Sequence, residues 1–176
     1  MFGPTKRKWI LAAVLCLLAA LTALPARAAL DPALVQGLAG DFNARVAAID
    51  ALGVAGGDEA AALLDALEGG RLGTLDGRLV VIAPDGLRDA ASGEALSADS
   101  EATSRITVNN RLRRAIATAR AAFALSAPEA AQRLAAANTL RENASPALLP
   151  VLTRALEAEQ DDAVRAVLLY ATAKLE

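Results

Sequence analysis

Hydrophobic residues recur at every third or fourth position through most of this chain, which is the spacing of one face of an α-helix. In the first third they predict a short helix at about 32–38, opened by Asp31 and Pro32, and then two helices separated by the glycine-rich segment 53–57, with Gly57 or Asp58 as the cap of the second. The apolar positions of these two helices are Phe42, Val46, Ile49 and Leu52, and Leu63, Leu64 and Leu67.

The pattern changes between residues 71 and 104. Two short apolar runs, 71–75 and 78–82, flank Asp76-Gly77, a pair typical of tight hairpin turns because such turns need positive φ. Later turn signals at Asp85-Gly86 and Ser92-Gly93 predict a third strand near 87–90 and a flexible loop over 97–104. We therefore expect a small β-meander inserted between helices.

The helical spacing returns at Ile106 and predicts one long helix to about Leu125, followed by three helices that start near 128, 145 and 161. The last of these is apolar over more than one stripe, through Val164, Val167, Leu168 and Leu169. A terminal helix of a repeat array normally has a polar outer face, so we expect either that the physical structure continues or that another chain covers this end.

A short motif recurs within the helices. Its arginines are Arg45, Arg133 and Arg165, and each follows an acidic residue: Asp41, Glu129 and Asp161. The last two copies are 32 residues apart (165 − 133), the length of one helix-turn-helix repeat. The sequence thus predicts a mainly α fold, a HEAT-like helical-repeat solenoid with a small β-hairpin or meander insert. We expect each arginine to pair with an acid of its own or the neighbouring repeat, so that Arg133→Ala lowers the melting temperature.

The first 28 residues are typical of a secretory signal. Lys6, Arg7 and Lys8 precede an apolar run of 16 residues from position 9 to 24, and Ala26-Arg27-Ala28 fits a cleavage site after Ala28. The run is short for a spanning helix, so a retained anchor is the weaker alternative. We expect an exported protein, in the periplasm or at the periplasmic face of the inner membrane, with segments 1–28 (signal), 29–70 (first helical repeat), 71–104 (β insert and loop) and 105–176 (long helix and further repeats).

The expected mature chain has 148 residues (176 − 28) and no Cys, Met or His. It therefore has no disulfide framework and no zinc or copper ligand set. Four of the 18 basic residues and none of the 20 acidic ones lie in the first 28 positions, so the mature net charge is 14 − 20 = −6. This balance argues against nucleic-acid binding.

Catalytic and cofactor motifs are absent from the sequence. There is no Gly-x-Ser-x-Gly and no histidine base, Lys174 is the only lysine of the mature part, and no glycine-rich segment has the form of a phosphate cradle. The acids at 85–94 do not fit a calcium loop. Glu157 and Glu159 fit a solvated helix face. We expect neither an enzyme nor a cofactor or metal site.

A basic cluster is the one local exception to the acidic composition. It can be a solvated face paired with acids of adjacent repeats, or a docking face for an acidic protein or for lipid head groups. Just before it, Asn109-Asn110 can cap the helix or bind a partner backbone. The cluster consists of Arg105, Arg111, Arg113, Arg114 and Arg120.

Taken in order, several segments resemble one family. They are the signal sequence, the runs 41–49, 77–82 and 92–96, the run Val108-Asn-Asn-Arg-Leu-Arg-Arg114 and the later repeats. Together they are similar to the extracytoplasmic N-terminal extension of the urea ABC transporter permease subunit, in the branched-chain amino-acid permease superfamily. The run 108–114 and the order helix pair, hairpin, helix, repeats are the specific parts.

The resemblance implies an accessory or docking role beside a urea importer, with the permease membrane domain or the periplasmic urea-binding protein as partner. In that family the extension precedes a multi-helix permease, but no apolar run of spanning length follows Leu24 here, so no transport residue carries over. Contact with the membrane is then expected only through a retained anchor or a missing permease part. The alternative is a free-standing periplasmic helical-repeat scaffold for protein–protein interaction.

Overall fold

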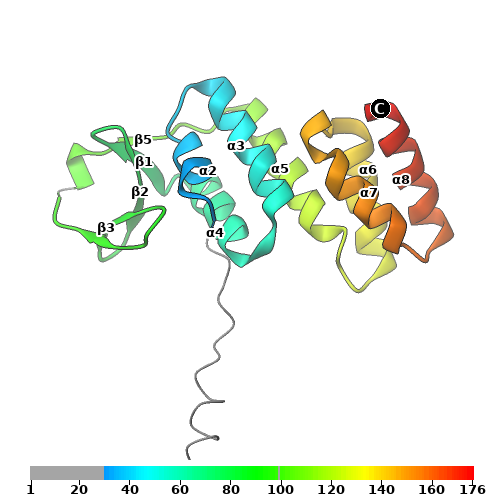
Figure 1. Cartoon of the computed structure of the whole chain (residues 1–176). Coiled ribbons are helices and arrows are strands. Elements are labelled where there is room, and N and C mark those ends of the chain that lie inside the picture. The colour runs from blue at the N-terminus through cyan, green and yellow to red at the C-terminus, as the bar shows by residue number, and fades with distance from the viewer. Residues whose placement is uncertain (1–29, 99) are drawn as a thin grey trace, which may run out of the picture.

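The computed structural model describes residues 30–98 and 100–176, so the expected signal segment lies outside the described residues. The described part is mainly helical, with one small antiparallel sheet, as predicted. Figure 1 shows an elongated row, with the sheet at one end, α2 to α5 in the middle and α6 to α8 at the other end. The helices are α2 (Pro32–Gly37), α3 (Phe42–Ala55), α4 (Gly57–Glu68), α5 (Asn110–Ala124), α6 (Ala130–Asn143), α7 (Leu149–Ala158) and α8 (Asp162–Leu175).

Short polar side chains start four of these helices. Asp31, Asp41 and Asn109 each accept a hydrogen bond from a backbone N–H two or three residues ahead, and Asp161 accepts two. Each such bond satisfies a donor that the first turn of a helix leaves without a partner. The capping role expected of Asn109 is thereby confirmed.

The helix α3 is longer than the sequence predicts, because Gly53 lies inside it. We expected segment 53–57 to interrupt the chain, but α3 continues through Gly53 to Ala55. Gly53 is buried, and a Cβ on it would lie 3.1 Å from Leu148 Cδ2 and 3.2 Å from the Cα of Ala119. The residue thus permits close packing rather than a turn. The predicted N-cap of α4 is also wrong, since the cap is Gly56 and not Gly57 or Asp58.

The sheet has five strands in the order β4-β3-β2-β1-β5. The predicted hairpin is present, with Asp76 and Gly77 at φ values of 49° and 77°. Gln36 of α2 holds this turn to the helices: its Nε2 donates to Gly77 O at 2.5 Å, and its Oε1 accepts from Leu79 N at 3.2 Å. The strands are β1 (Leu72–Leu75), β2 (Arg78–Ala83), β3 (Gly86–Asp89), β4 (Ala95–Leu96) and β5 (Ser104–Arg105).

The segment expected to be a flexible loop ends in regular structure. A 3₁₀ turn covers Ser100–Ala102, and β5 pairs with the free edge of β1 through Gly73↔Arg105 and Thr74↔Ser104. Gly73 permits this pairing, because a Cβ there would lie 2.5 Å from Thr103 Cγ2. A two-residue strand has too little periodicity to be found from sequence.

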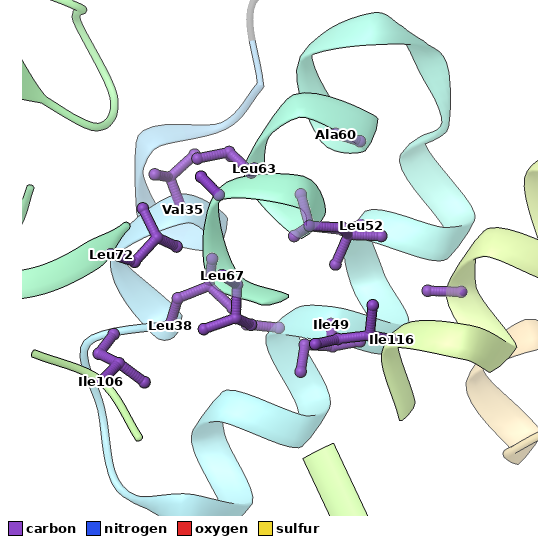
Figure 2. Close-up of a cluster of buried hydrophobic side chains, with 14 of the residues drawn as sticks. Val35, Leu38, Ile49, Leu52, Ala60, Leu63, Leu67, Leu72, Ile106 and Ile116 are labelled. Atoms are coloured by element: carbon purple, nitrogen blue, oxygen red, sulfur yellow. The ribbon is translucent and has the colours of Figure 1, made fainter. Parts of the chain in front are cut away.

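The long helix α5 joins two buried clusters. It starts at Asn110, not at Ile106, which instead packs beside β1 as a buried residue. Figure 2 shows the first cluster, where side chains of α2, α3, α4 and α5 meet Leu72 and Ile106. Ala119 belongs to this cluster and Ala121, two residues later, to the second, which α5 shares with α6, α7 and α8.

The last three helices pack as the apolar stripes predict. α6 packs against both α5 and α8, and α7 packs against α8. A 3₁₀ turn at Pro146–Leu148 precedes α7 and brings Leu148 against α3. Most residues of the predicted stripes are buried: Ala137, Leu140, Leu148, Leu152, Val164, Leu168 and Ala171. The other members, Leu134, Leu149, Leu156 and Val167, are half-buried.

Candidate functional site

The three repeat arginines share one local geometry. Each lies four residues after the N-cap of its helix, and its backbone N–H donates to the carbonyl of that cap. Their side chains turn back and donate to carbonyl groups of the preceding segment. Arg45 reaches Leu38 O and Gly40 O at 2.9 and 2.8 Å, Arg133 reaches Ala127 O and Pro128 O at 3.0 and 2.9 Å, and Arg165 reaches Leu156 O at 2.9 Å.

The acids of the motif do not pair with their arginines as expected. Asp41 and Asp161 accept hydrogen bonds from backbone N–H groups of their own helices, and neither forms an ion pair with its arginine among the described residues. Glu129 caps α6 by position but makes no side-chain cap bond. The arginines therefore fasten their helices to the preceding segment, and Asp41 and Asp161 cap the starts of the helices that contain Arg45 and Arg165.

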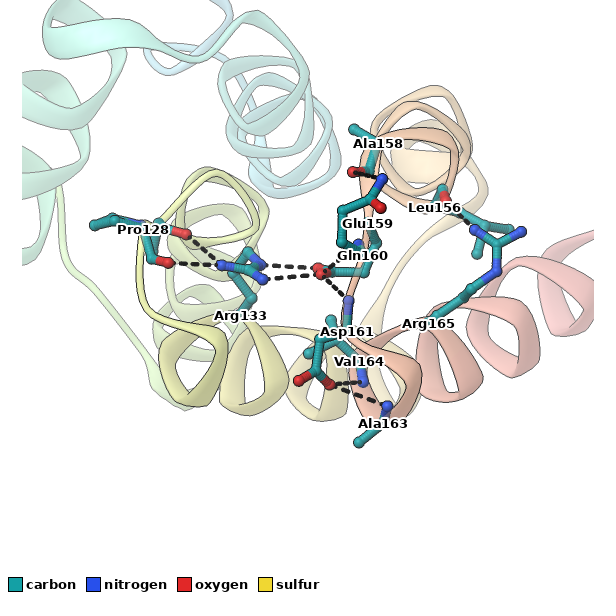
Figure 3. Close-up of polar contacts among 11 residues, drawn as sticks. Pro128, Arg133, Leu156, Ala158, Glu159, Gln160, Asp161, Ala163, Val164 and Arg165 are labelled. Atoms are coloured by element: carbon teal, nitrogen blue, oxygen red, sulfur yellow. Dashed lines mark hydrogen bonds and ion pairs between the residues drawn. The ribbon is translucent and has the colours of Figure 1, made fainter.

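Among the residues that the structure describes, Arg133 is the one of the three that also binds an acid, from the loop between α7 and α8. Its Nε lies 2.8 Å from Glu159 Oε2 and its Nη2 lies 2.8 Å from Oε1, as Figure 3 shows. The Glu159 side chain is 4 % exposed and that of Arg133 is 18 % exposed. A two-point contact of this kind fixes both position and direction. It joins α6 to the loop before α8.

Glu159 has further partners that favour its charged form. Its Oε1 accepts from the backbone N–H groups of Gln160 and Asp161, both at 2.9 Å. The hydrogen bonds from Arg133, opposed by partial desolvation, lower the pKa of Glu159 to about 2, and the pair raises the pKa of Arg133. The solvated role expected of Glu159 is wrong, because it points inward. Since 26 residues separate it from Arg133, no local spacing marks it.

The basic cluster does not form one continuous free face. Arg120 pairs with Asp65 and Glu68 of α4 at 2.5 and 2.7 Å. Arg105, on β5, donates to Gly70 O at 3.1 Å. These contacts join α5 and β5 to α4 and its end, so two of the five arginines serve the fold.

The remaining three arginines lie exposed on the first turns of α5. Arg111 stacks over the ring of Phe42, 5.0 Å from its centre, and Arg113 donates to Asn110 Oδ1 at 3.2 Å. Arg114 has no charged or hydrogen-bonded side-chain partner in the part of the chain that the structure describes.

A cleft of about 460 Å³ opens between α3 and α7. Gly53 of α3 packs against Leu148, in the turn that precedes α7. Beyond that contact the end of α3 and α7 enclose the cleft, with the end of α5 as its floor. Arg154 and the Arg133–Glu159 pair lie on its walls. Its apolar lining residues include Val54, Ala122, Phe123, Leu125, Val151 and Ala155.

A second cleft of about 480 Å³ lies between α4 and the strands β2 and β3. Glu59, on its wall, accepts a hydrogen bond from Leu30 N at 3.2 Å and so fixes the start of the described chain. Asp89, on the other side, accepts bonds from Ala91 N and Ser92 N at 2.9 Å. Backbone N–H groups therefore already bind the carboxylates of both Glu59 and Asp89.

Leu169 and Tyr170 of α8 are large apolar side chains that are 50 % and 63 % exposed. Over the described ranges, no three His, Cys, Asp or Glu side chains come close enough to hold a metal ion together. None of the helices seen there combines the length and the apolar character needed to span a bilayer.

Comparison with known proteins gives no relative: no protein-family model, no curated protein and no solved structure matches this chain.

Proposed function

We propose that this chain is a non-catalytic, extracytoplasmic docking domain built from HEAT-like helical repeats, and that it serves a urea ABC importer. The proposal of a docking domain built from repeats rests on the geometry that the three arginines share. At three places, separated by up to 120 residues (165 − 45), an arginine four residues after an N-cap fastens its helix to the segment before it. Recurrence of one connecting device is what a repeat array produces.

The shape and composition support binding rather than chemistry. Helices stacked in a row present long side surfaces to other proteins. The expected mature chain has no Cys or His, and its one lysine, Lys174, donates to Arg141 O at 3.0 Å. Reaction types that use a nucleophile and a nearby base therefore have few candidate residues here.

The urea importer is the narrower part of the proposal, and it rests on the sequence resemblance alone. The segments that carry the resemblance fall on distinct elements: run 41–49 on α3, run 77–82 on the β1–β2 hairpin and run 108–114 at the start of α5. Under this proposal the domain contacts the permease or the urea-binding protein on the periplasmic side.

Binding to importer subunits tests the proposal. The chain is expressed in its own host with its own signal and purified, and its affinity for that host's urea-binding protein and detergent-solubilised urea permease is measured by biolayer interferometry. We expect saturable binding to at least one of them, in the micromolar range typical of transient contacts. A periplasmic binding protein for another solute is the matched control.

The free-standing scaffold is the second candidate. The observation that favours it is the exposure of Leu169 and Tyr170, which offer an apolar surface to a partner outside the importer. A folded chain that binds neither importer subunit at concentrations up to roughly 100 μM would exclude the importer role and leave the scaffold. Binding equal to that of the control protein would have the same meaning.

A further inference from the structure

We propose that the cleft between α3 and α7 is the docking site of this domain, and that it receives a partner protein segment in which an apolar side chain neighbours a carboxylate. The inference rests on the proposed docking function and adds to it the place of contact and the chemistry of the partner.

The cleft lies between the end of α3 and α7, next to the end of α5. Gly53 lets α3 approach Leu148, because a Cβ at this position would lie only 3.1 Å from the Leu148 side chain. α3 then ends at Ala55, before Gly56 and Gly57, whereas α7 continues to Ala158, so the end of α3 leaves the later part of α7 uncovered. A volume of about 460 Å³ is within the range of natural ligand pockets and suits one or two large side chains.

The walls of the cleft are apolar and only partly buried. Val54, Phe123, Val151 and Ala155 each retain intermediate exposure. In the fold they pack along the second hydrophobic cluster or, for Phe123, the first, and their outer surfaces remain open to water. An apolar side chain that covers them would remove this surface from water, which is favourable by about 25 cal/mol per Å².

The charged residues that line the cleft indicate which group of the partner lies next to its apolar side chain. Three charged side chains line the cleft, and two of them, Arg133 and Glu159, neutralise each other. The third, Arg154, is exposed and has no ion pair or side-chain hydrogen bond in the described part of the chain. The cleft therefore has one uncompensated positive charge beside an apolar wall, and electrostatic complementarity selects a carboxylate.

The Arg133–Glu159 pair gives this wall a fixed shape. It joins the start of α6 to the end of α7, on the side of the cleft opposite α3, and Glu159 is held by two backbone donors as well. A pre-shaped wall lowers the ordering cost of binding. The glycines at the opposite rim, Gly56 and Gly57, have no atoms within 4 Å of their Cβ positions, so a chain segment can approach the backbone there.

Peptide selection tests the proposal without a known partner. The purified full chain is used to select from a displayed library of random dodecapeptides, and the enriched peptides are synthesised for affinity measurement by calorimetry. We expect enrichment of Asp or Glu within two positions of Leu, Ile or Phe. Arg154→Gln should raise the dissociation constant of such a peptide about tenfold.

Two variants control this experiment. Arg114→Gln removes another exposed arginine, one that lies outside the cleft, and it should leave the affinity unchanged. Ala155→Trp fills the cleft and should abolish binding, with a thermal unfolding curve to verify that the variant folds. Peptides without the acidic-apolar pattern, or peptides that bind Arg154→Gln and wild type equally, would overturn the cleft proposal.

The outcomes separate this inference from the proposed function. Importer subunits that bind wild type and Arg154→Gln equally would refute the cleft and retain the docking role. Selected peptides that need the cleft, together with no binding of either importer subunit, would support the cleft and refute the urea assignment. Binding of 4-methylpentanoate in the cleft with no peptide selected would refute a protein partner there.

Discussion

The two halves of this molecule hold together by different means, and α5 belongs to both. The first half packs large aliphatic side chains between helices and a sheet: only four of the sixteen residues in its buried cluster are alanine. The second half has no strand among its described residues, and five of the eleven residues in its cluster are alanine. It also contains the ion pair between Arg133 and Glu159, of which no counterpart of similar burial occurs in the described part of the first half.

The difference shows how small side chains change the interactions that hold one helix in position against another. A leucine fits its neighbours in few ways, whereas alanine-rich faces are smooth and constrain the relative position of two helices less. In the second half the two-point contact at Glu159 adds the missing directional constraint. The same pair shapes a wall of the cleft, so stability and the proposed docking site share residues there.

The largest expected effect is loss of a core leucine in the first half. Leu52 is fully buried, and Leu52→Ala removes apolar contacts and leaves a cavity, so we expect the free energy of unfolding to fall by about 3 kcal/mol. Urea denaturation measures it. Because α5 contributes to both clusters, we also expect one unfolding transition for both halves.

Leu169→Ala is the matched control for this experiment. Leu169 is 50 % exposed, and its truncation should change stability by less than roughly 0.5 kcal/mol. Two separate transitions in wild type would show that α5 does not couple the halves, and an unaffected Leu52→Ala variant would contradict the assignment of the first core.

The second expected effect arises from a change in the other half. Glu159→Gln keeps the shape of the side chain but leaves the Arg133 guanidinium without its carboxylate, so we expect a melting temperature lower by about 5 °C at neutral pH. Glu157→Gln, at an exposed position of α7, should have no comparable effect.

Acid titration sharpens this prediction. The pKa of Glu159 is about 2 in the fold against an ordinary value of 4.5, so its contribution is complete above about pH 5 and is lost as the pH falls toward 2. Calorimetry from pH 7 to pH 2 should show a shallower acid decline for Glu159→Gln than for wild type. Parallel curves for the two proteins would show that the ion pair does not stabilise the fold.

Local features of the chain were predictable and long-range ones were not. The hairpin at Asp76-Gly77, the Asn109 cap and the apolar stripes follow from spacing, because turn geometry and helix faces depend on neighbours in sequence. Gly53 and Glu159 were misread because each has its meaning only beside a distant residue, Leu148 or Arg133. The cleft could not be predicted at all, since it depends on where two separate helices end.

The smallest expected effect tests the sheet, which distinguishes the first half from the second. Gly77 sits at φ 77° in the β1–β2 turn and accepts a hydrogen bond from Gln36 at its carbonyl. Alanine is strained at this angle, so Gly77→Ala should lower the free energy of unfolding by about 1 kcal/mol. Asp76→Asn is the control, because asparagine tolerates the left-handed conformation at φ 49° and should leave stability nearly unchanged. A loss much larger than 1 kcal/mol in urea denaturation would mean that the turn supports the α2 contact as well as the sheet, so that the sheet is an integral part of the first core.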